Sequence, residues 1–186
     1  MIYLIEADET THLPLIMAWR STPLVYKGFY QQRSPLIWES HVNWFRTRNS
    51  DWRTFVIMMG ENNWDEPGVI MGTWEYARLA LRADHVKSTE TDRPIGVVTI
   101  GQLDHWSPEI GYFIGETTLW GKGLGTEAVQ MGIEWIMEYS KTHRHISGIH
   151  TTIKDDNIGS IKLIKKLGFK KGMKARNGEH YYFRGL

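Results

Sequence analysis

Apolar and polar positions in the first part of the chain fall into two kinds of repeat. Residues 1–7 (MIYLIEA) alternate weakly and residues 54–59 (TFVIMM) form a short β-rich run, so both predict strands. Between these runs, apolar side chains recur at steps of three and four, which predicts two helices joined by an irregular or short helical segment. We expect Thr10 or Thr11 to cap the first helix and Ser34 to open the second.

The same periodicities become sharper after residue 93. They predict, in chain order, strands over 94–103 and 109–115, a helix over 124–140, a strand over 146–153, a helix capped by Asp156 or Asn157, and a closing hairpin around 176–178. Strands interspersed with amphipathic helices predict an α/β (α+β) domain.

Residues 60–93 fit neither periodicity. Turn-forming and polar residues there interrupt short apolar runs. Two interpretations remain open for this segment. It is either a surface excursion or a functional insertion, such as a substrate-side lid or a subunit contact.

Composition narrows the classes of function. The 186 residues suit one domain, and a formal net charge of +1 gives no broad electrostatic surface for nucleic acid. The absence of cysteine excludes disulfides, thiolate zinc sites and a cysteine nucleophile. No apolar run approaches the ~20 residues of a membrane helix, and the first residues lack the basic region of a secretory signal, so we expect a cytoplasmic protein without a membrane partner. His143, His145 and His150 have no carboxylate at helical spacing, and no metal is expected.

Three glycines stand between the predicted strand over 109–115 and the helix that follows it. Gly121, Gly123 and Gly125 would allow several backbone N–H groups to converge at a helix N-terminus, where the helix dipole favours an anion. The segment has neither the G-x-x-x-x-G-K-[ST] spacing of a P-loop nor the G-x-G-x-x-G spacing of a dinucleotide fold. The geometry suits a phosphate or pyrophosphate of another ligand class, but glycine-rich turns before helices are also common without a ligand, so both interpretations stay open at this point.

Several segments in the same order resemble one family. PIGVVTIGQL, PEIGYFIGETTLWGKGLGTEAV and DDNIGSIKLIKKLGF resemble the acyl-CoA-binding half of the GNAT superfamily of N-acetyltransferases. That superfamily has the loop pattern [QR]-x-x-G-x-[GA], which corresponds to residues 120–125 here. Trp120 stands in the first position of this pattern, and in this respect the chain resembles the RimJ/RimL-like branch. The segments LIMAWRSTPLV and SPLIWESHVNWF resemble the two early helices of that branch. The resemblance covers nearly the whole chain apart from residues 60–93.

The resemblance implies a fold and a cosubstrate. The fold would be a single domain over residues 1–186, with a mixed, mostly antiparallel sheet of about seven strands, splayed at a bulge and flanked by helices. The cosubstrate would be acetyl-CoA. Its pantetheine arm would pair with the backbone of Phe113, Ile114 and Gly115 and contact Asn157, which could equally be a plain helix cap. Its pyrophosphate would lie on the backbone amides of the glycine loop: Gly121, Lys122, Gly123, Gly125 and Thr126.

Catalytic roles follow less directly from the resemblance. Glu109 starts the splayed strand and could act as a base through water, or it could be a strand-end glutamate in a pairing role. Ser160 could hydrogen-bond the departing thiolate, or it could be a secondary helix cap. The tyrosine that many relatives use as an acid is replaced by Ile164, and Thr152 stands where some relatives carry a glutamate base.

The acceptor cannot be identified from the sequence. The resemblance implies direct transfer to a primary amine, on a small molecule or a protein N-terminus, in a ternary complex. Tyr26, Phe29 and Tyr30 lie in an irregular aromatic segment and are expected to form a wall of the acceptor site. An alternative is an acyl-CoA-binding sensor or interaction module without turnover. A homodimer is also possible.

Overall fold

The structure is a computed structural model that describes residues 1–29, 32–48, 50–60, 92–143, 145–175 and 178–186. Most of the segment 60–93 that fits neither periodicity lies outside the described residues, as do Tyr30 and two residues of the final hairpin turn.

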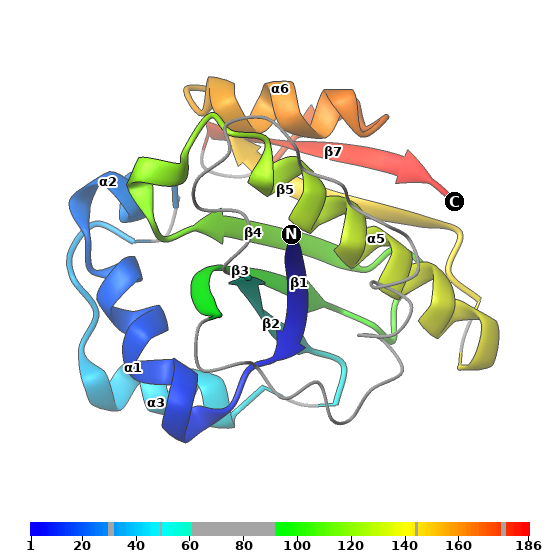
Figure 1. Ribbon diagram of the computed structural model, residues 1–186. Coiled ribbons are helices and arrows are strands. Elements are labelled where there is room, and N and C mark those ends of the chain that lie inside the picture. Colours follow the sequence, from blue (N-terminus) through cyan, green and yellow to red (C-terminus); the bar gives the residue numbers. More distant parts are fainter. Residues whose placement is uncertain (30–31, 49, 61–91, 144, 176–177) are drawn as a thin grey trace.

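A seven-stranded sheet forms the centre of the described structure, with strand order β1-β2-β3-β4-β5-β7-β6 (Figure 1). Every pair of neighbouring strands is antiparallel except β4 and β5, which run parallel. The mostly antiparallel sheet predicted from the sequence is therefore confirmed. The strands are β1 Ile2–Glu6, β2 Arg53–Met59, β3 Arg93–Gly101, β4 Glu109–Ile114, β5 Gly148–Lys154, β6 Lys170–Lys174 and β7 Glu179–Gly185.

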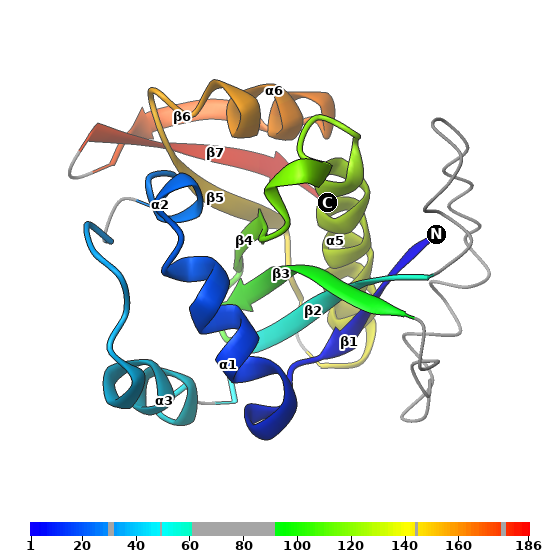
Figure 2. The same ribbon diagram turned by 60° about the vertical axis from the view of Figure 1, so that its left-hand side comes forward.

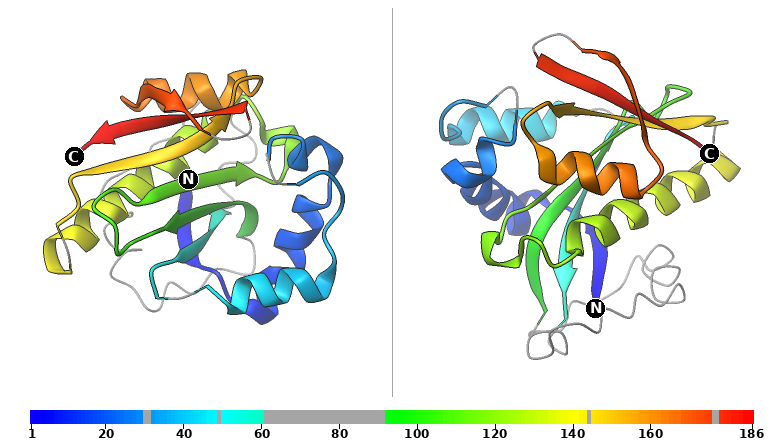
Figure 3. Two further views of the ribbon diagram at one scale, coloured as in Figure 1. Left: turned by 180° about the vertical axis from the view of Figure 1, so that it is seen from behind. Right: turned by 90° about the horizontal axis from the view of Figure 1, so that it is seen from above.

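Helices cover both faces of this sheet. They are α1 Glu9–Arg20, α2 Pro23–Tyr26, α3 Trp38–Arg46, α5 Leu124–Thr142 and α6 Ile158–Lys166, with a 3-10 turn η2 at Thr117–Leu119. The first three lie on one face and α5 on the other, and α6 lies on the same side as α5 (Figures 2 and 3). Among the described helices none is long and apolar enough to cross a bilayer.

The starts of the first two main helices differ from the sequence-based expectation. Asp8, not Thr10 or Thr11, caps α1, because its carboxylate accepts a hydrogen bond from the Thr11 N–H at 2.8 Å. The helix α3 begins at Trp38 after an extended Ile37 that makes no side-chain cap, so Ser34 does not open it.

Two apolar clusters hold the layers together. The larger joins the sheet to α5 and α6 through residues such as Ile110, Ile133 and Ile164. The smaller joins the other face to α1 through Trp19 and Val97. The side chains of β4 alternate between the two clusters, as its pleat requires.

The strands β4 and β5 pair at a single register position, Glu109 opposite His150, and then diverge. The register between β4 and β3 is continuous from Gly101–Glu109 to Gly96–Ile114, so the bulge expected in β4 is not found on that side. The sheet does shift register, but between Ile57 and Met58 of β2. The gap beside β4 therefore arises from the departure of β5 and not from an extra residue in β4.

Gly115, directly after β4, is a packing requirement. A Cβ on this residue would lie 2.1 Å from the Trp19 ring. We expect Gly115→Ala to lower the free energy of unfolding by about 1–3 kcal/mol, because the indole must move away from Phe113. Urea denaturation measures this loss, with Gly185→Ala as the control, since a Cβ at Gly185 meets nothing within 4 Å. Equal stability of the two variants would contradict the packing argument.

Candidate active site

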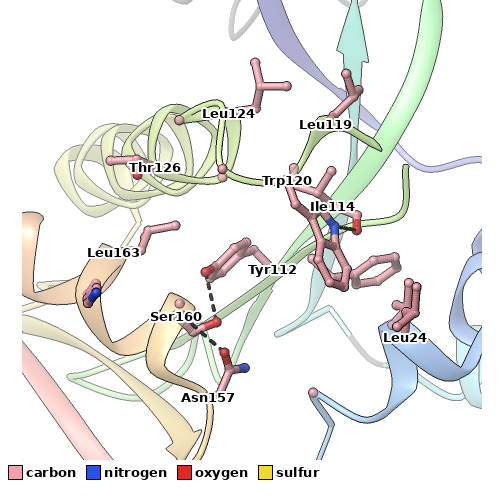
Figure 4. A pocket seen from close by; sticks show the side chains of 18 of the residues that line it. Leu24, Tyr112, Ile114, Leu119, Trp120, Leu124, Thr126, Asn157, Ser160 and Leu163 are labelled. Atoms are coloured by element: carbon pink, nitrogen blue, oxygen red, sulfur yellow. Dashed lines mark hydrogen bonds between the residues drawn. The ribbon is translucent and has the colours of Figure 1, made fainter. Parts of the chain in front are cut away.

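A pocket of ≈ 770 Å³ opens beside the carboxyl end of β4, where β5 has diverged (Figure 4). It is lined by the α2 region, β4, the glycine loop and α6. The residues that line it and matter below are Lys27, Gly28, Phe29, Tyr112, Phe113, Ile114, Trp120, Gly121, Gly123, Gly125, Thr126, Asn157, Ser160, Lys162 and Lys166. One cavity thus brings together most of the site residues expected from the sequence.

The glycine loop ends this pocket at the N-terminus of α5. Gly121 and Gly123 have φ angles of +78° and +86°, a region that side chains with a Cβ rarely adopt. Gly123 is the N-cap, and it offers no side-chain acceptor to the first turn. In the described part of the chain, no carbonyl accepts from the backbone N–H groups of residues 121–125. These unpaired donors and the helix dipole make the loop fit for a phosphate.

Two expected loop contacts are altered by this geometry. The Thr126 N–H already donates to the Gly123 carbonyl at 2.9 Å, so this amide is not available to a phosphate, although Thr126 does line the pocket. The Lys122 side chain is exposed and is not among the lining residues, which leaves only its backbone as a contact.

The backbone of β4 presents alternate residues to the gap. The Gly115 N–H donates to the Ile95 carbonyl of β3 at 2.8 Å. Because hydrogen-bonded positions alternate along an antiparallel pair, Phe113 also directs its N–H and C=O toward β3. The prediction that the backbones of Phe113 and Gly115 pair with pantetheine is therefore wrong, and Tyr112 and Ile114 are the residues whose backbone groups face the gap.

Trp120 further restricts that edge. Its indole N–H donates to the Ile114 carbonyl at 2.8 Å, which occupies one of the backbone acceptors expected for the cosubstrate (Figure 4). The Ile114 N–H and the Tyr112 backbone are left for a strand-like ligand. From the sequence, Trp120 was assigned only by its position in the family's loop pattern, because the indole–carbonyl hydrogen bond forms only in the folded loop.

Three lysines add positive charge around the pocket. Lys27 directly follows α2 in the wall on that side, and Lys162 and Lys166 belong to α6. None of the three forms an ion pair with a described carboxylate. A pocket with unpaired lysines and unpaired amides suits a ligand with several phosphate charges.

A pair of hydroxyl groups lies in the wall between β4 and α6. The Tyr112 hydroxyl donates to Ser160 Oγ at 3.0 Å, and the Ser160 N–H donates to Asn157 Oδ1 at 3.2 Å (Figure 4). Asn157 is therefore the cap of α6 and also a lining residue. Burial raises the pKa of Tyr112, so its hydroxyl stays protonated at neutral pH. Tyr112 was not predicted from the sequence, although it directly precedes Phe113 in β4.

Glu109 lies where β4 and β5 separate. Its carboxylate accepts a hydrogen bond from Thr152 Oγ1 at 3.1 Å, so the threonine that replaces a glutamate in some relatives orients this one. Burial and then the charge of Glu109 raise the pKa of the neighbouring Glu179. Glu109 does not line the pocket itself; like Phe113, it lies on the sheet face that carries α1.

The three residues predicted to form a wall of the acceptor site have different outcomes. Phe29 lines the pocket and packs edge-on against Phe113, with 5.5 Å between ring centroids. Tyr26 is not among the lining residues, and Tyr30 lies outside the described residues. The segment after α1 thus lines the same cavity as the glycine loop instead of a separate one. Within the described ranges, no group of three or more His, Asp or Glu side chains is placed to hold a metal.

Comparisons with known proteins identify the family of this chain. Residues 2–170 match the family model described as acetyltransferase (GNAT) domain. The uncharacterized protein MJ1062 of Methanocaldococcus jannaschii is 38% identical over 174 residues, which cover 91% of this chain but 28% of that relative's length. The chain thus spans less than a third of this relative.

Two solved structures are similar along their whole length. A domain from Methanocaldococcus jannaschii DSM 2661 has a TM-score of 0.78 at 33% identity. The match covers 100% of this chain and 99% of the chain of that domain. Spermidine N-acetyltransferase from Vibrio cholerae, solved with CoA and spermine, has a TM-score of 0.66 at 12% identity, with coverages of 99% and 95%. At 12% identity, the similarity to the Vibrio cholerae structure shows only that the fold is shared. The chain belongs to the GNAT acetyltransferase family.

Proposed function

We propose that this protein is an acetyl-CoA-dependent N-acetyltransferase that moves the acetyl group directly to a primary amine in a ternary complex. The observation that carries the proposal is the glycine loop, whose unpaired amides end a pocket that continues to the gap beside β4. A CoA-shaped ligand needs both features, because it has a pyrophosphate at one end and an extended amide-bearing arm. The family membership and the CoA bound in the Vibrio cholerae relative support the same assignment.

The residues fit acetyl-CoA at three places. Amides of the glycine loop would hold the pyrophosphate, and Lys162 and Lys166 would neutralise phosphate charge. The backbone of Tyr112 and the Ile114 N–H would pair with the pantetheine arm in the gap. Acetyl-CoA supplies an acetyl thioester, which is an activated acyl donor.

The chain's own groups would manage two protons. Glu109, at the separation of β4 and β5, would accept a proton from the acceptor's ammonium group, directly or through water, so that the neutral amine attacks the thioester carbonyl. Ser160 accepts a hydrogen bond from Tyr112, so its own hydroxyl is free to donate a hydrogen bond that stabilises the leaving thiolate. Positioning of the amine beside the thioester would supply much of the remaining rate.

A RimJ/RimL-like assignment and a small-molecule amine acceptor are the finer parts of this proposal. Trp120 before the glycine loop supports the branch. The spermine bound in the Vibrio cholerae relative supports a small amine, and a protein N-terminus is the competing acceptor.

An amine panel tests the function. The chain has no cysteine, so a thiol reagent reports only CoA released from acetyl-CoA. We expect thiol release that depends on the amine and saturates with acetyl-CoA, together with an acetylated product seen by mass spectrometry. A panel of polyamines, amino sugars, amino acids and peptides without any amine-dependent release would overturn the enzyme assignment.

One observation favours a second candidate, a non-catalytic acyl-CoA-binding module. The position of the acid tyrosine in many relatives is Ile164, which is 1% exposed and supplies no proton. In that case acetyl-CoA would bind without turnover, and the same panel separates the two candidates.

The hydroxyl pair gives a specific expectation. Ser160→Ala should lower kcat by roughly 10-fold with little change in the acetyl-CoA Kd, because it removes the donor to the leaving sulfur. Tyr112→Phe should lower kcat by a smaller factor, since Ser160 keeps its own proton. Rapid-quench turnover and calorimetry measure both quantities. A Ser160→Ala enzyme with unchanged kcat in which chemistry is rate-limiting would leave Ser160 as a helix residue only.

A further inference from the structure

Two arginines meet around one indole on the sheet face that carries α1. Arg20 ends α1, Trp44 lies on α3, and Arg48 follows α3, and the two helices run side by side (Figure 2). The Arg48 guanidinium carbon lies 3.5 Å from the Trp44 ring centroid, and that of Arg20 lies 5.2 Å from it. The Phe29 ring centroid lies 5.1 Å from the Arg20 guanidinium carbon, and the Trp52 ring centroid lies 4.1 Å from the Arg48 guanidinium carbon.

Neither guanidinium is in ion-pair contact with an anion in the described part of the chain, although the more distant charge of Glu109 acts on Arg48. No described carboxylate forms an ion pair with Arg20 or Arg48, and Arg20 Nε is buried without a hydrogen-bond partner. The only described partner of the Arg48 guanidinium in a hydrogen bond is the Thr54 hydroxyl, at 3.2 Å. Burial and then the charge of Arg20 lower the pKa of Arg48. Two like charges are thus gathered where desolvation penalises each of them.

A third side chain in the cluster has one polar atom without a hydrogen-bond partner. His41 is buried, stacks on Trp44 at 5.6 Å, and leaves its Nε2 without a hydrogen bond. Burial and then Arg20 lower its pKa, so the ring is neutral at pH 7 and adds no third charge. The aromatic rings provide cation–π contacts, but these provide no acceptor for the guanidinium N–H groups.

The cluster borders the open part of the sheet beside Glu109. Thr54, Thr99 and Gly111 occupy one cross-strand row over β2, β3 and β4, and all point to the α1 face. Thr99 and Gly111 are small and only partly buried. The sheet surface that they form between the arginines and the end of β5 is called the small-residue floor below. Two strand spacings separate Thr54 from Gly111, which places the arginine end roughly 10 Å from the gap. Glu109, in the same strand as Gly111, is close enough for its charge to offset part of the lowering of the Arg48 pKa that burial and Arg20 cause.

We propose, resting on the proposed transferase function, that the acceptor carries an anionic group besides its amine, and that Arg20 and Arg48 bind that group. The amine lies beside Glu109, and a carboxylate or phosphate lies across the small-residue floor on the two guanidiniums. The class of acceptor is therefore an amine with a carboxylate or phosphate roughly 10 Å away. A polycation such as spermine, which the Vibrio cholerae relative binds, lacks this anion.

Matched acceptor pairs test this class. The pairs are 6-aminohexanoate with 6-aminohexanamide and 6-aminohexyl phosphate with 6-aminohexanol, so that each pair differs in the anion. We expect the anionic member of at least one pair to have a kcat/KM about 10-fold higher or more, as charge-assisted hydrogen bonds to arginine require. The pair that shows the preference identifies carboxylate or phosphate as the source. Equal kcat/KM within both pairs overturns the inference.

Arg48→Gln should abolish that preference and leave the acetyl-CoA Kd unchanged. The control is Arg46→Gln, an exposed arginine that pairs with Glu9 at 2.6 Å and should keep the preference. Circular dichroism and Tm establish that Arg48→Gln is folded, because the substitution also removes the guanidinium contacts with the Trp44 and Trp52 rings. Retention of the preference in a folded Arg48→Gln enzyme overturns the assignment of the anion to this cluster.

A binding measurement keeps the test independent of turnover. In the absence of acetyl-CoA, 6-aminohexyl phosphate or 6-aminohexanoate should shift the 15N–1H resonances of Arg20 Nε and Arg48 Nε saturably in the wild type. The Arg48→Gln variant should lose the Arg20 shift. Shifts without acetyl transfer would support the anion site and contradict the transferase, whereas transfer without shifts or preference would contradict the anion site alone.

Discussion

Gly123→Val should weaken acetyl-CoA binding by about 100-fold, which corresponds to two lost charge-assisted hydrogen bonds of about 1.5 kcal/mol each. A Cβ at Gly123 meets nothing within 4 Å of the protein, so the added side chain would occupy the space above the loop where a phosphate would lie. Its φ of +86° also disfavours a β-branched residue and would pull the unpaired amides out of alignment. Calorimetry with acetyl-CoA measures the effect.

Gly168→Val is the matched control. Gly168 follows α6 with a φ of +84°, its Cβ would also meet nothing within 4 Å, and it does not line the pocket. Both variants should lose about 1–2 kcal/mol of stability from the left-handed conformation, but only Gly123→Val should lose affinity. Gly123→Ala serves if the valine variant does not fold. Unchanged affinity in a folded Gly123 variant would remove the loop from the binding site.

Glu109→Gln should lower kcat/KM for the amine on the order of 10- to 1,000-fold, because the amide cannot accept the ammonium proton. The acetyl-CoA Kd should change little, since Glu109 does not line the pocket. Steady-state kinetics over a range of pH, with calorimetry for acetyl-CoA, measure the two quantities. A Glu109→Gln enzyme with wild-type kcat/KM at every pH would leave water or positioning in the role of the base.

Thr152→Val is the companion variant for Glu109. It keeps the carboxylate and removes the hydroxyl that donates to it at 3.1 Å. A smaller loss, of about a few-fold in kcat/KM, is expected because orientation is weakened while basicity remains. Losses of equal size in the two variants would indicate that the hydrogen bond, and not proton transfer, limits the rate.

Local pattern was sufficient to predict most of the fold. Short runs of β-forming apolar residues placed β2, β3 and β4 within a residue or two, and the four-and-three spacing placed α5, which buries one face against the sheet. Helix starts were less predictable. Asp8 competes with Thr10 and Thr11 as a cap, and only the backbone conformation decides among them.

The site was predictable in outline and not in its hydrogen bonding. The spacing of the glycines identified the loop, because backbone positions with positive φ angles are usually occupied by glycine. Which backbone groups of β4 face the gap depends on its register against β3, so Phe113 and Gly115 were predicted in place of Tyr112. The arginine cluster was not predicted, since Arg20, Trp44 and Arg48 meet only when α1 and α3 pack together.

Acetyl-CoA is expected to bind with its phosphates on the glycine loop. Amide NMR of the 15N-labelled protein tests it directly, because glycine amides occupy a distinct part of the spectrum and those of Gly121, Gly123 and Gly125 have no partner within the described chain. We predict that acetyl-CoA shifts these three resonances saturably, together with that of Ile114, at one ligand per protein. Saturable binding that leaves all three glycine resonances in place, or no binding at all, would contradict the account.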